Sequence, residues 1–589
     1  MKRFKADLDD DNNKNNDDDV VDLTADDDVD NKTMDATWMH PSNRWSLLPS
    51  TVENSSSSIL NNNAIENISS STTTQPPFRV GAFQNPIGRV LVSSTGDVLC
   101  RGFYVPECEQ RVTRSVPELI LPLDLQEAVL FTFDCQFDVL VEEFGHVLTY
   151  KSDGARRIHV MSNSFPNNAQ GDTKRLQCQA MFQAQFDVSF PQAKITLLIH
   201  PTPPVPMFGC FHPKCWLLFY PHGFRCIIQT SNTDQPSPSN LCELMWYQDF
   251  PLKSALSPIA PDNINDFESV LADLVENVLP NSVGRALKSR LNLHDFSSAE
   301  VALVVSRPNG GAAWSGSDAF RFGLGRLESL LRLAEDSIPA DWPCVVQCSS
   351  IGKQTSKSSK EGPWIQVELG RAMRGAKAIP KNLKIIAISE SEVMEMRKTQ
   401  PGAGGSTFFS ALKLKKYTST GREDVYGDDE DHVEGFFERQ NVWTWTPPPQ
   451  SLQSRVFAAP HCKTLTRYNP NAPRELAWFV LGSHNASAAA YGGWTSQARD
   501  KLLMRSFELS ILFSPVIYSR AGRRRYSVEK KTYEQVFPEN LDMDSLTFVA
   551  DKQQFPLEIL IPVPYRLPGN EYRPEDKVWN IQADFDEVQ

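Results

Sequence analysis

The chain carries one short pattern twice, and this duplication limits the possible folds more than any other feature of the sequence. The first copy reads His-Pro-Lys at 212–214, and an apolar stretch leads from it to Thr-Ser-Asn at 230–232. The second copy reads His-Cys-Lys at 461–463 and leads in the same way to Gly-Ser-His-Asn at 482–485. Packing alone does not require these residue types at this spacing twice, so the pattern predicts two similar halves that build one site together.

The length and patterning of the chain fit two α/β halves behind a polar leader. A chain of 589 residues exceeds what one hydrophobic core normally supports. Residues 1–78 are rich in Asp, Asn, Ser and Thr, cannot bury enough apolar surface to fold, and are expected to be a disordered tail. Strand-like and helical patterns then alternate and restart near Val301. We therefore expect two α/β domains, at 79–298 and 299–589.

Individual elements can be placed by the period of their apolar residues. Strands are expected at 90–92, 194–199, 216–220, 224–228, 301–305, 345–347 and 383–388, and helices at 267–278 and 320–334. Residues 353–361 and 422–431 are polar and are expected to be solvated loops.

Composition argues against several classes of protein. No apolar run is long enough to cross a membrane, and the N-terminus lacks the apolar core of a signal peptide, so we expect an intracellular protein without a membrane partner. Eleven cysteines without any Cys-x-x-Cys pattern favour reduced thiols over disulfides or a structural metal.

The net charge of −13 is unevenly distributed. Residues 1–40 hold thirteen Asp/Glu against five Lys/Arg, which leaves 59 acidic and 54 basic residues in the rest of the chain. The part expected to fold is thus only mildly acidic. A local basic groove that binds nucleic-acid phosphates is compatible with this balance, although net charge alone does not suggest one.

The duplicated residues predict a chemistry. In an extended segment the histidine and the lysine of each copy project to the same side. One His-x-Lys is usually a strand edge with a solvated lysine, but two facing copies bring together two imidazoles, two ammonium groups and two amides. These supply a nucleophile, a proton donor and fixed positive charge, which are the requirements of phosphoryl transfer, and neither a metal nor a cofactor is then needed.

At this point the sequence resembles a known family. His-x-Lys followed by Gly-Ser-x-Asn resembles the phospholipase D superfamily, but the aspartate that follows the lysine in the phospholipases is replaced by Phe219 and Tyr468. The loss of that acid in both copies resembles the tyrosyl-DNA phosphodiesterase family. Further segments similar to that family occur in the same order, at 207–209, 347–352, 401–406, 505–509, 562–565 and 579–580, and the resemblance covers roughly residues 120–589.

The resemblance implies a fold and a reaction. The fold would be two phospholipase D-like α-β-α domains related by a pseudo-twofold axis. The reaction would be hydrolysis of the 3′-phosphotyrosyl bond between DNA and a stalled type I topoisomerase, leaving a 3′-phosphate. His212 would be the nucleophile that becomes phosphohistidine, and His461 would be the general acid and base. The residues that would hold the phosphoryl oxygens are Lys214, Lys463, Asn232 and Asn485.

The resemblance also assigns supporting and DNA-contacting residues. Glu508 matches the glutamate that supports the nucleophile, and Glu243 stands where the family usually has the glutamine that supports the second histidine. Phe208 is expected to stack on a DNA base, with core packing as the alternative. Ser350 and Ser487 match serines that contact the DNA backbone, but the family's lysine after the second serine is replaced here by an alanine.

Two charged segments outside the duplicated pattern suggest partners and location. Val20, Val21, Asp22, Leu23 and Thr24, flanked by aspartates, resemble a SUMO-interacting motif, with a chance apolar cluster as the alternative. The basic run 520–525 fits a nuclear import signal, a DNA contact or a solvated loop equally well. We expect the protein in the nucleus, with the cytoplasm as a further location.

Two other functions remain open from the sequence. One is a phospholipase D-like nuclease that processes other 3′ adducts or acts on RNA. The other is a catalytically inactive scaffold that binds nucleic acid. Both copies keep the histidine, the lysine and the asparagine, which favours an enzyme over the scaffold.

Overall fold

Two large sheets organise the part of the chain that the structure describes. The computed structural model describes Arg89–Ser93 and, with gaps, residues 113–579, and the longer segments outside this description are 94–112, 235–240, 255–265, 355–361, 410–436, 447–457, 515–532 and 535–560. Both sheets belong to one unit of the chain, Val80–Gln589. The leader with its Val20–Thr24 motif, the acidic loop 422–431 and the basic run 520–525 lie outside the described residues.

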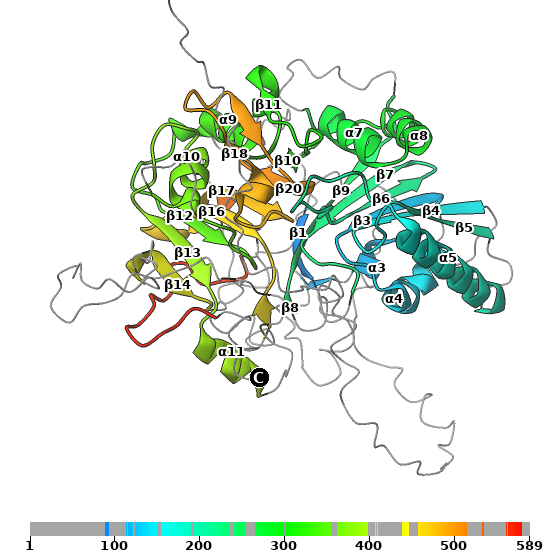
Figure 1. Ribbon diagram of the computed structural model, residues 1–589, viewed down its shortest axis with the longest axis horizontal. Coiled ribbons are helices and arrows are strands. Elements are labelled where there is room, and N and C mark those ends of the chain that lie inside the picture. The colour runs from blue at the N-terminus through cyan, green and yellow to red at the C-terminus, as the bar shows by residue number, and fades with distance from the viewer. Residues whose placement is uncertain are drawn as a thin grey trace, which may run out of the picture. The chain divides into compact units, whose positions relative to one another are not determined.

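The first sheet is mixed, and helices cover both of its faces. Its strand order is β2 (Thr113–Arg114), β1 (Arg89–Ser93), β9 (Leu244–Pro251), β7 (Gly223–Gln229), β6 (Cys215–Tyr220), β3 (Glu127–Thr132), β4 (Ala155–Ser162) and β5 (Lys194–His200). Strands β6 and β7 are buried along their whole length, which explains why their sequences are continuously apolar. Helices α4 (Phe137–Thr149) and α5 (Ala169–Ser189) pack on one face, and α7 (Phe267–Val278) and α8 (Asn281–Leu291) on the other (Figure 1).

The second sheet repeats the central order of the first. It runs β10 (Ala302–Ser306), β20 (Glu508–Phe513), β17 (Ala472–Gly482), β16 (Thr464–Asn469), β12 (Cys344–Gln347), β13 (Leu383–Ala387) and β14 (Val442–Thr444), and β21 (Tyr533–Glu534) pairs with β17. In both sheets four strands pair antiparallel, β9-β7-β6-β3 and β20-β17-β16-β12, and the next strand is parallel. Helix α9 (Gly323–Glu335) packs beside β10.

Shorter elements complete the described part of the fold. Two further strand groups are β11 (Trp314–Ser315) with β19 (Lys501–Leu503) and β18 (Gly493–Trp494), and β8 (Leu241–Cys242) with β15 (Ala459–Pro460). The remaining helices are α3 (Val116–Leu119), α10 (Gly370–Met373), α11 (Glu390–Arg397) and α12 (Ala488–Tyr491), with short turns of other helical type at Gly316–Phe320, Ile365–Leu369 and Arg439–Asn441. Our proposed domain boundary between 298 and 299 falls in the connection between α8 and β10.

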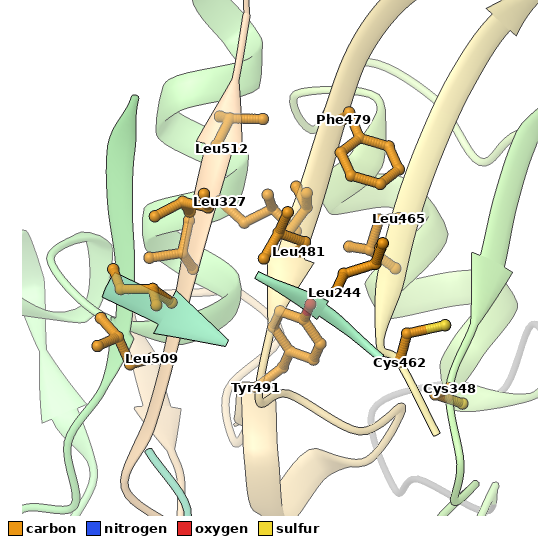
Figure 2. Packing of buried hydrophobic residues seen from close by; sticks show 14 of the residues in the cluster. Leu244, Leu327, Cys348, Cys462, Leu465, Phe479, Leu481, Tyr491, Leu509 and Leu512 are labelled. Atoms are coloured by element: carbon orange, nitrogen blue, oxygen red, sulfur yellow. The ribbon is translucent and has the colours of Figure 1, made fainter. Parts of the chain in front are cut away.

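The two sheets share one hydrophobic core. Strands β7 and β9 of the first sheet contact β17 and β20 of the second. Figure 2 shows Leu244, the first residue of β9, lying among Leu465 of β16 and Leu481 of β17. The sheets therefore meet at β7, β9, β17 and β20, next to the strand ends at which the duplicated motifs lie.

The structure confirms the elements expected from apolar periodicity. The strands expected at 194–199, 216–220 and 224–228 are β5, β6 and β7, and the helix expected at 267–278 is α7. The helix expected over 320–334 begins later, at Gly323, because a short 3₁₀ turn ends at Phe320. Among the described helices, none is both long and apolar enough to cross a membrane.

Candidate active site

Each His-x-Lys lies immediately before a central strand. His212 and Lys214 lie outside the strand itself, because β6 begins at Cys215, directly after Lys214. The reason is that the backbone N–H of His212 donates to Phe507 of the second half (3.0 Å), and Pro213 has no N–H to donate to a neighbouring strand. The segment is still extended enough that the Lys214 carbonyl accepts from Gln229 (3.0 Å), so the motif is anchored to both halves.

The second copy is anchored in the same way. The backbone N–H of His461 donates to Cys242 of the first half (3.3 Å), and the Lys463 carbonyl accepts from Gly482 (3.2 Å). Strand β16 begins at Thr464, one residue after the lysine. Each motif is therefore held by backbone hydrogen bonds across the halves and by one within its own sheet. The second motif has two such bonds across the halves, because the N–H of Cys462 also donates to the Cys242 carbonyl (2.9 Å).

Each histidine is held by a carboxylate from the opposite half. His212 Nδ1 lies 2.8 Å from Glu508 Oε2, and His461 Nδ1 is hydrogen-bonded to Glu243 Oε1. A partner on Nδ1 fixes the orientation of the ring and directs Nε2 to the substrate side. The structure thus brings together the four residues that the sequence predicted as two histidine–carboxylate pairs.

Two hydroxyl groups that the sequence analysis missed hold these carboxylates. Ser483 Oγ donates to Glu508 Oε2 (2.5 Å), and Thr230 Oγ1 donates to Glu243 Oε2 (2.5 Å). Each hydroxyl oxygen also accepts from the backbone N–H of the residue after its glutamate, at 2.9 Å in both copies. Their position, two residues before each motif asparagine, was the available signal in the sequence.

The two lysines are buried and repel each other. Lys214 Nζ donates to the backbone carbonyl of His212 (3.0 Å), and Lys463 Nζ donates to that of His461. Burial, followed by repulsion from Lys463, lowers the pKa of Lys214 to about 7. Burial likewise lowers the pKa of Lys463. Both amines are therefore easier to deprotonate than an exposed lysine, and a bound phosphate would favour their charged form.

The charges of the two copies act on His212. Burial lowers the pKa of His212 well below its usual range, and the positive charges of Lys214 and Lys463 lower it further. A pKa this low keeps the imidazole neutral at pH 7, and only the neutral ring has a lone pair with which to attack phosphorus.

The two glutamates differ in charge state. Burial raises the pKa of Glu508 to about 7. Burial also acts on Glu243, but its contacts with His461 and the nearby Lys463 hold its pKa below the usual range. Burial lowers the pKa of His461, and the Glu243 carboxylate opposes that effect. The second pair therefore has more ionic character than the first.

The motif asparagines lie where β7 and β17 end. Asn485 Oδ1 accepts from Ser349 Oγ and from the backbone N–H of Ser350, both at 3.2 Å. Because its oxygen is occupied in this way, the amide nitrogen is the group that can donate to a phosphoryl oxygen. Asn232 Nδ2 donates to Asp234 Oδ2 (3.4 Å).

Asp234 adds a buried acid beside this asparagine, which the sequence analysis did not single out. Burial and the neighbouring Asp134 carboxylate raise the pKa of Asp234 to about 8. Asp134 is itself anchored, because it accepts from the Ser164 hydroxyl and from the backbone N–H of Cys135. At neutral pH Asp234 is therefore mostly protonated and adds little negative charge next to the lysines.

Phe133 is a further site residue that the sequence analysis missed. Its half-buried ring meets the His212 ring edge to face at a centroid distance of 4.9 Å, and Lys214 Nζ lies 5.4 Å from its centroid. An aromatic face attracts a nearby ammonium group and limits the movement of the imidazole. Phe133 follows β3 by one residue, so only the pairing of β3 with β6 brings it to the motif.

The expected DNA-contacting residues lie at the edge of the site. Phe208 is 62% exposed, so the alternative that it packs in the core is wrong. Ser350 and Ser487 lie on neighbouring segments, because Ile351 forms a bridge with Ala486. The Ser487 hydroxyl accepts from the backbone N–H of Ala490 (3.1 Å) and so also caps α12.

Among the described residues, no group of three or more His, Cys, Asp or Glu side chains could hold a metal ion. Nine described cysteines are free thiols, and eight of them are buried.

Comparison with known proteins identifies the family. The family model described as tyrosyl-DNA phosphodiesterase matches residues 103–573, which is well over half of the chain. This chain belongs to the tyrosyl-DNA phosphodiesterase family. A curated relative, tyrosyl-DNA phosphodiesterase 1 of Arabidopsis thaliana, is 28% identical over 406 residues. That match covers 63% of this chain and 59% of the relative, so the chain spans about three fifths of the relative's length.

Solved structures show the same fold. Yeast tyrosyl-DNA phosphodiesterase is similar with a TM-score of 0.54 at 15% identity, over 84% of this chain and 99% of the yeast chain. A mutant of the yeast protein gives a TM-score of 0.55 at 16% identity, over 84% and 98% of the two chains. The chain therefore has the phospholipase D-like α/β fold that the resemblance implied.

Within the tyrosyl-DNA phosphodiesterase family this chain places Glu243 where the resemblance led us to expect a glutamine. The hydrogen bond with His461 Nδ1 shows that the carboxylate occupies the supporting position directly. Ala488, which stands in place of the expected lysine, is the first residue of α12 and brings no positive charge to the edge of the site.

Proposed function

We propose that this protein hydrolyses the phosphodiester that links a DNA 3′ end to a tyrosine, such as the adduct left by a stalled type I topoisomerase. Membership of the tyrosyl-DNA phosphodiesterase family supports this substrate class. The observation that carries the proposal is the pair of histidines, each held through Nδ1 by a carboxylate from the opposite half. Two such rings beside two buried lysines suit a two-step displacement at one phosphorus.

In the first step, His212 Nε2 attacks phosphorus and forms the N–P bond of a phosphohistidine. The bond between phosphorus and the tyrosine oxygen breaks, and His461 gives its proton to the departing phenolate. The other phosphoryl oxygens accept hydrogen bonds from Lys214, Lys463, Asn232 and Asn485. These donors stabilise the negative charge of the oxygens in the transition state. The Glu243 carboxylate favours the protonated His461 that this step needs.

In the second step, His461 is neutral and removes a proton from water. The resulting hydroxide attacks phosphorus, the N–P bond breaks, and a 3′-phosphate leaves while His212 is restored. Proton transfer by a positioned side chain contributes roughly 10²–10⁴-fold to such a rate.

The surroundings of the site suit a single DNA strand. We propose that Phe208 stacks on a base, that Ser350 and Ser487 contact the backbone, and that the adducted peptide is the leaving group. Because the proposed substrate is an adduct on DNA, we also propose a nuclear location. A SUMO-bearing partner of Val20–Thr24 stays a proposal from the sequence alone.

The test is incubation of the protein with a 5′-labelled single strand that carries a 3′-phosphotyrosine. The expected product is a strand ending in a 3′-phosphate, and His212→Ala should give none. A matched strand without the tyrosine tests the alternative nuclease, which would cleave internucleotide bonds or RNA at comparable rates. Binding of both strands without cleavage would instead indicate a scaffold and contradict the proposal.

A further inference from the structure

Two short segments from opposite halves run side by side at the edge of the site. They are residues 207–211 and 505–507, and we call them together the rim strap. The backbone N–H of Phe507 donates to the Cys210 carbonyl (2.9 Å), and that of Cys210 donates to Ser506 Oγ (3.3 Å). Because His212 follows directly and donates to the Phe507 carbonyl, the rim strap is continuous with the proposed nucleophile.

Phe208 has an unusual conformation within the rim strap. Its φ is +61°, a left-handed value that bulky residues with a Cβ rarely adopt. Its ring is nevertheless largely exposed, so core packing does not compensate for the strain. A conformation of this kind persists only where surrounding contacts hold it.

Arg505 makes those contacts. Its Nη1 donates to the Met207 carbonyl (2.8 Å), and its guanidinium carbon lies 5.9 Å from the centroid of the Phe208 ring. Its own carbonyl oxygen would lie 2.0 Å from a Cβ placed on Gly209, so the two backbones touch and only glycine fits there. Arg505 therefore meets the residue before Phe208, the ring itself and the residue after it.

We propose that Arg505 is a positioning residue that holds Phe208 in its exposed, left-handed conformation as a stacking platform for a base of single-stranded DNA. This inference rests on the proposed function and adds to it the residue that prepares the platform. A planar guanidinium suits both tasks, because it donates to a carbonyl with one edge while it faces an aromatic ring. Lysine offers a compact charge without that plane.

The experiment is a double-mutant cycle on an oligonucleotide with a 3′-aryl phosphodiester. Arg505→Met removes the charge and the donor while keeping much of the length, and it should raise KM roughly 5- to 10-fold with little change in kcat, because loss of one stacked base weakens binding. In a Phe208→Ala background, Arg505→Met should add little, because a residue that acts through Phe208 has nothing left to position.

Two readouts separate positioning from a direct phosphate contact. If Arg505 contacted a phosphate, Arg505→Met would lower the slope of log affinity against log salt by about 1, whereas a positioning residue leaves that slope unchanged. Fully additive effects of the two substitutions, or a reduced slope, would overturn the inference. If Arg505→Met folds poorly, Arg505→Lys is measured in its place. A KM of Arg505→Lys equal to that of the wild type would also contradict a role for the planar guanidinium.

The matched control is Arg321→Met. Arg321 also lies over a phenylalanine ring, that of Phe322 (5.4 Å to the centroid), and pairs with Asp318 (3.2 Å). The variant has the same change in net charge, and its KM should equal the wild-type value. Wild-type hydrolysis of a mononucleotide 3′-aryl phosphodiester, which has no second base, tests the proposed function separately. Absence of that activity would refute the function, whereas additivity on the longer strand would refute only the role of Arg505.

Discussion

Residues of the same type differ in chemistry here because their neighbours differ. His212 is paired with Glu508, whose pKa burial raises to about 7, so this pair has little ionic character near neutral pH. His461 is paired with Glu243, which stays anionic and opposes the effect of burial on the histidine. A neutral ring suits a nucleophile, and a carboxylate that favours the protonated form suits an acid, so the two environments match the proposed division of labour.

Substitution of the two histidines should therefore give different products. His212→Ala should abolish the reaction, because no nucleophile remains. His461→Ala should still allow attack on an aryl ester but slow turnover by about 10²–10⁴-fold, because no base activates water. A denaturing gel should show a covalent protein–DNA adduct with the second variant alone. Accumulation of the adduct with His212→Ala would reverse the roles.

Glu243→Gln should shift the pH dependence of the reaction. The carboxylate raises the pKa of His461, so an amide in its place should lower that pKa further. His461 must be protonated to act as an acid, and the alkaline limb of kcat/KM should therefore move to lower pH. A pH profile of both proteins checks this, and a limb that stays in place or moves upward would contradict it.

Asp234 should make stability depend on pH. Burial, followed by the Asp134 carboxylate, raises the pKa of Asp234 to about 8, so the protonated form is favoured in the folded state. This contribution is fully present below the ordinary pKa of an aspartate and is lost as the pH rises through about 8. Asp234→Asn should therefore gain stability relative to the wild type between pH 5 and pH 9, on the order of a few kcal/mol.

Urea unfolding at several pH values measures this difference. Asp138→Asn, at an exposed position of α4, is the control and should follow the wild type. If the difference in unfolding free energy between Asp234→Asn and the wild type does not change with pH, Asp234 ionises in the folded state as it does in water.

At the scale of elements, the site is assembled from strand ends. Strands β7 and β17 end just before the asparagines, β6 and β16 begin just after the lysines, and the supporting glutamates lie at the starts of β9 and β20. Gly482, at the end of β17, lies very close to β20. A Cβ there would lie 2.2 Å from Ser510 Oγ and 2.4 Å from Ser510 Cα. The glycine permits the tight pairing that brings Ser483 to Glu508.

Gly482→Ala should therefore destabilise the protein and disturb the first histidine pair. The added methyl group forces β17 and β20 apart, and overpacking of this kind costs about 1–3 kcal/mol of unfolding free energy. Chemical denaturation measures the loss. Gly493→Ala is the control, because the nearest atom to its Cβ is Ala488 Cβ at 3.5 Å, an ordinary contact. Equal stabilities of the two variants would contradict the steric argument.

At the scale of the whole molecule, neither half contains a complete site. His212 depends on Glu508 and Phe507 from the second half, and His461 depends on Glu243 and Cys242 from the first. The shared core between β7, β9, β17 and β20 keeps these partners in register. The positive charge that would act on a bound phosphate likewise comes from both halves, because each half contributes one lysine.

Because these two lysines supply the charge, activity should not depend on a divalent metal. Hydrolysis of the 3′-phosphotyrosyl strand should proceed at the same rate, within about twofold, with and without an excess of EDTA. The measurement is the initial rate after dialysis against the chelator. Loss of activity in EDTA with recovery on adding magnesium would show that the lysines are insufficient.

The sequence by itself determined the strands, the α7 helix and the identity of the repeated histidines, lysines and asparagines. Apolar periodicity reports which face of a segment is buried, and a repeated polar pattern within apolar strands stands out without any structure. Glu508 and Glu243 were also found, but only through the family resemblance.

Only the tertiary structure decided which groups surround those residues. Phe133 and Asp234 carry no local signal, because a single polar or aromatic residue at a strand end is common. Phe208 could be read either as core or as exposed until its surroundings were known. His212 and Glu508 are 296 positions apart, and the distance between them is set by how two sheets pack, a property that local sequence patterns do not encode.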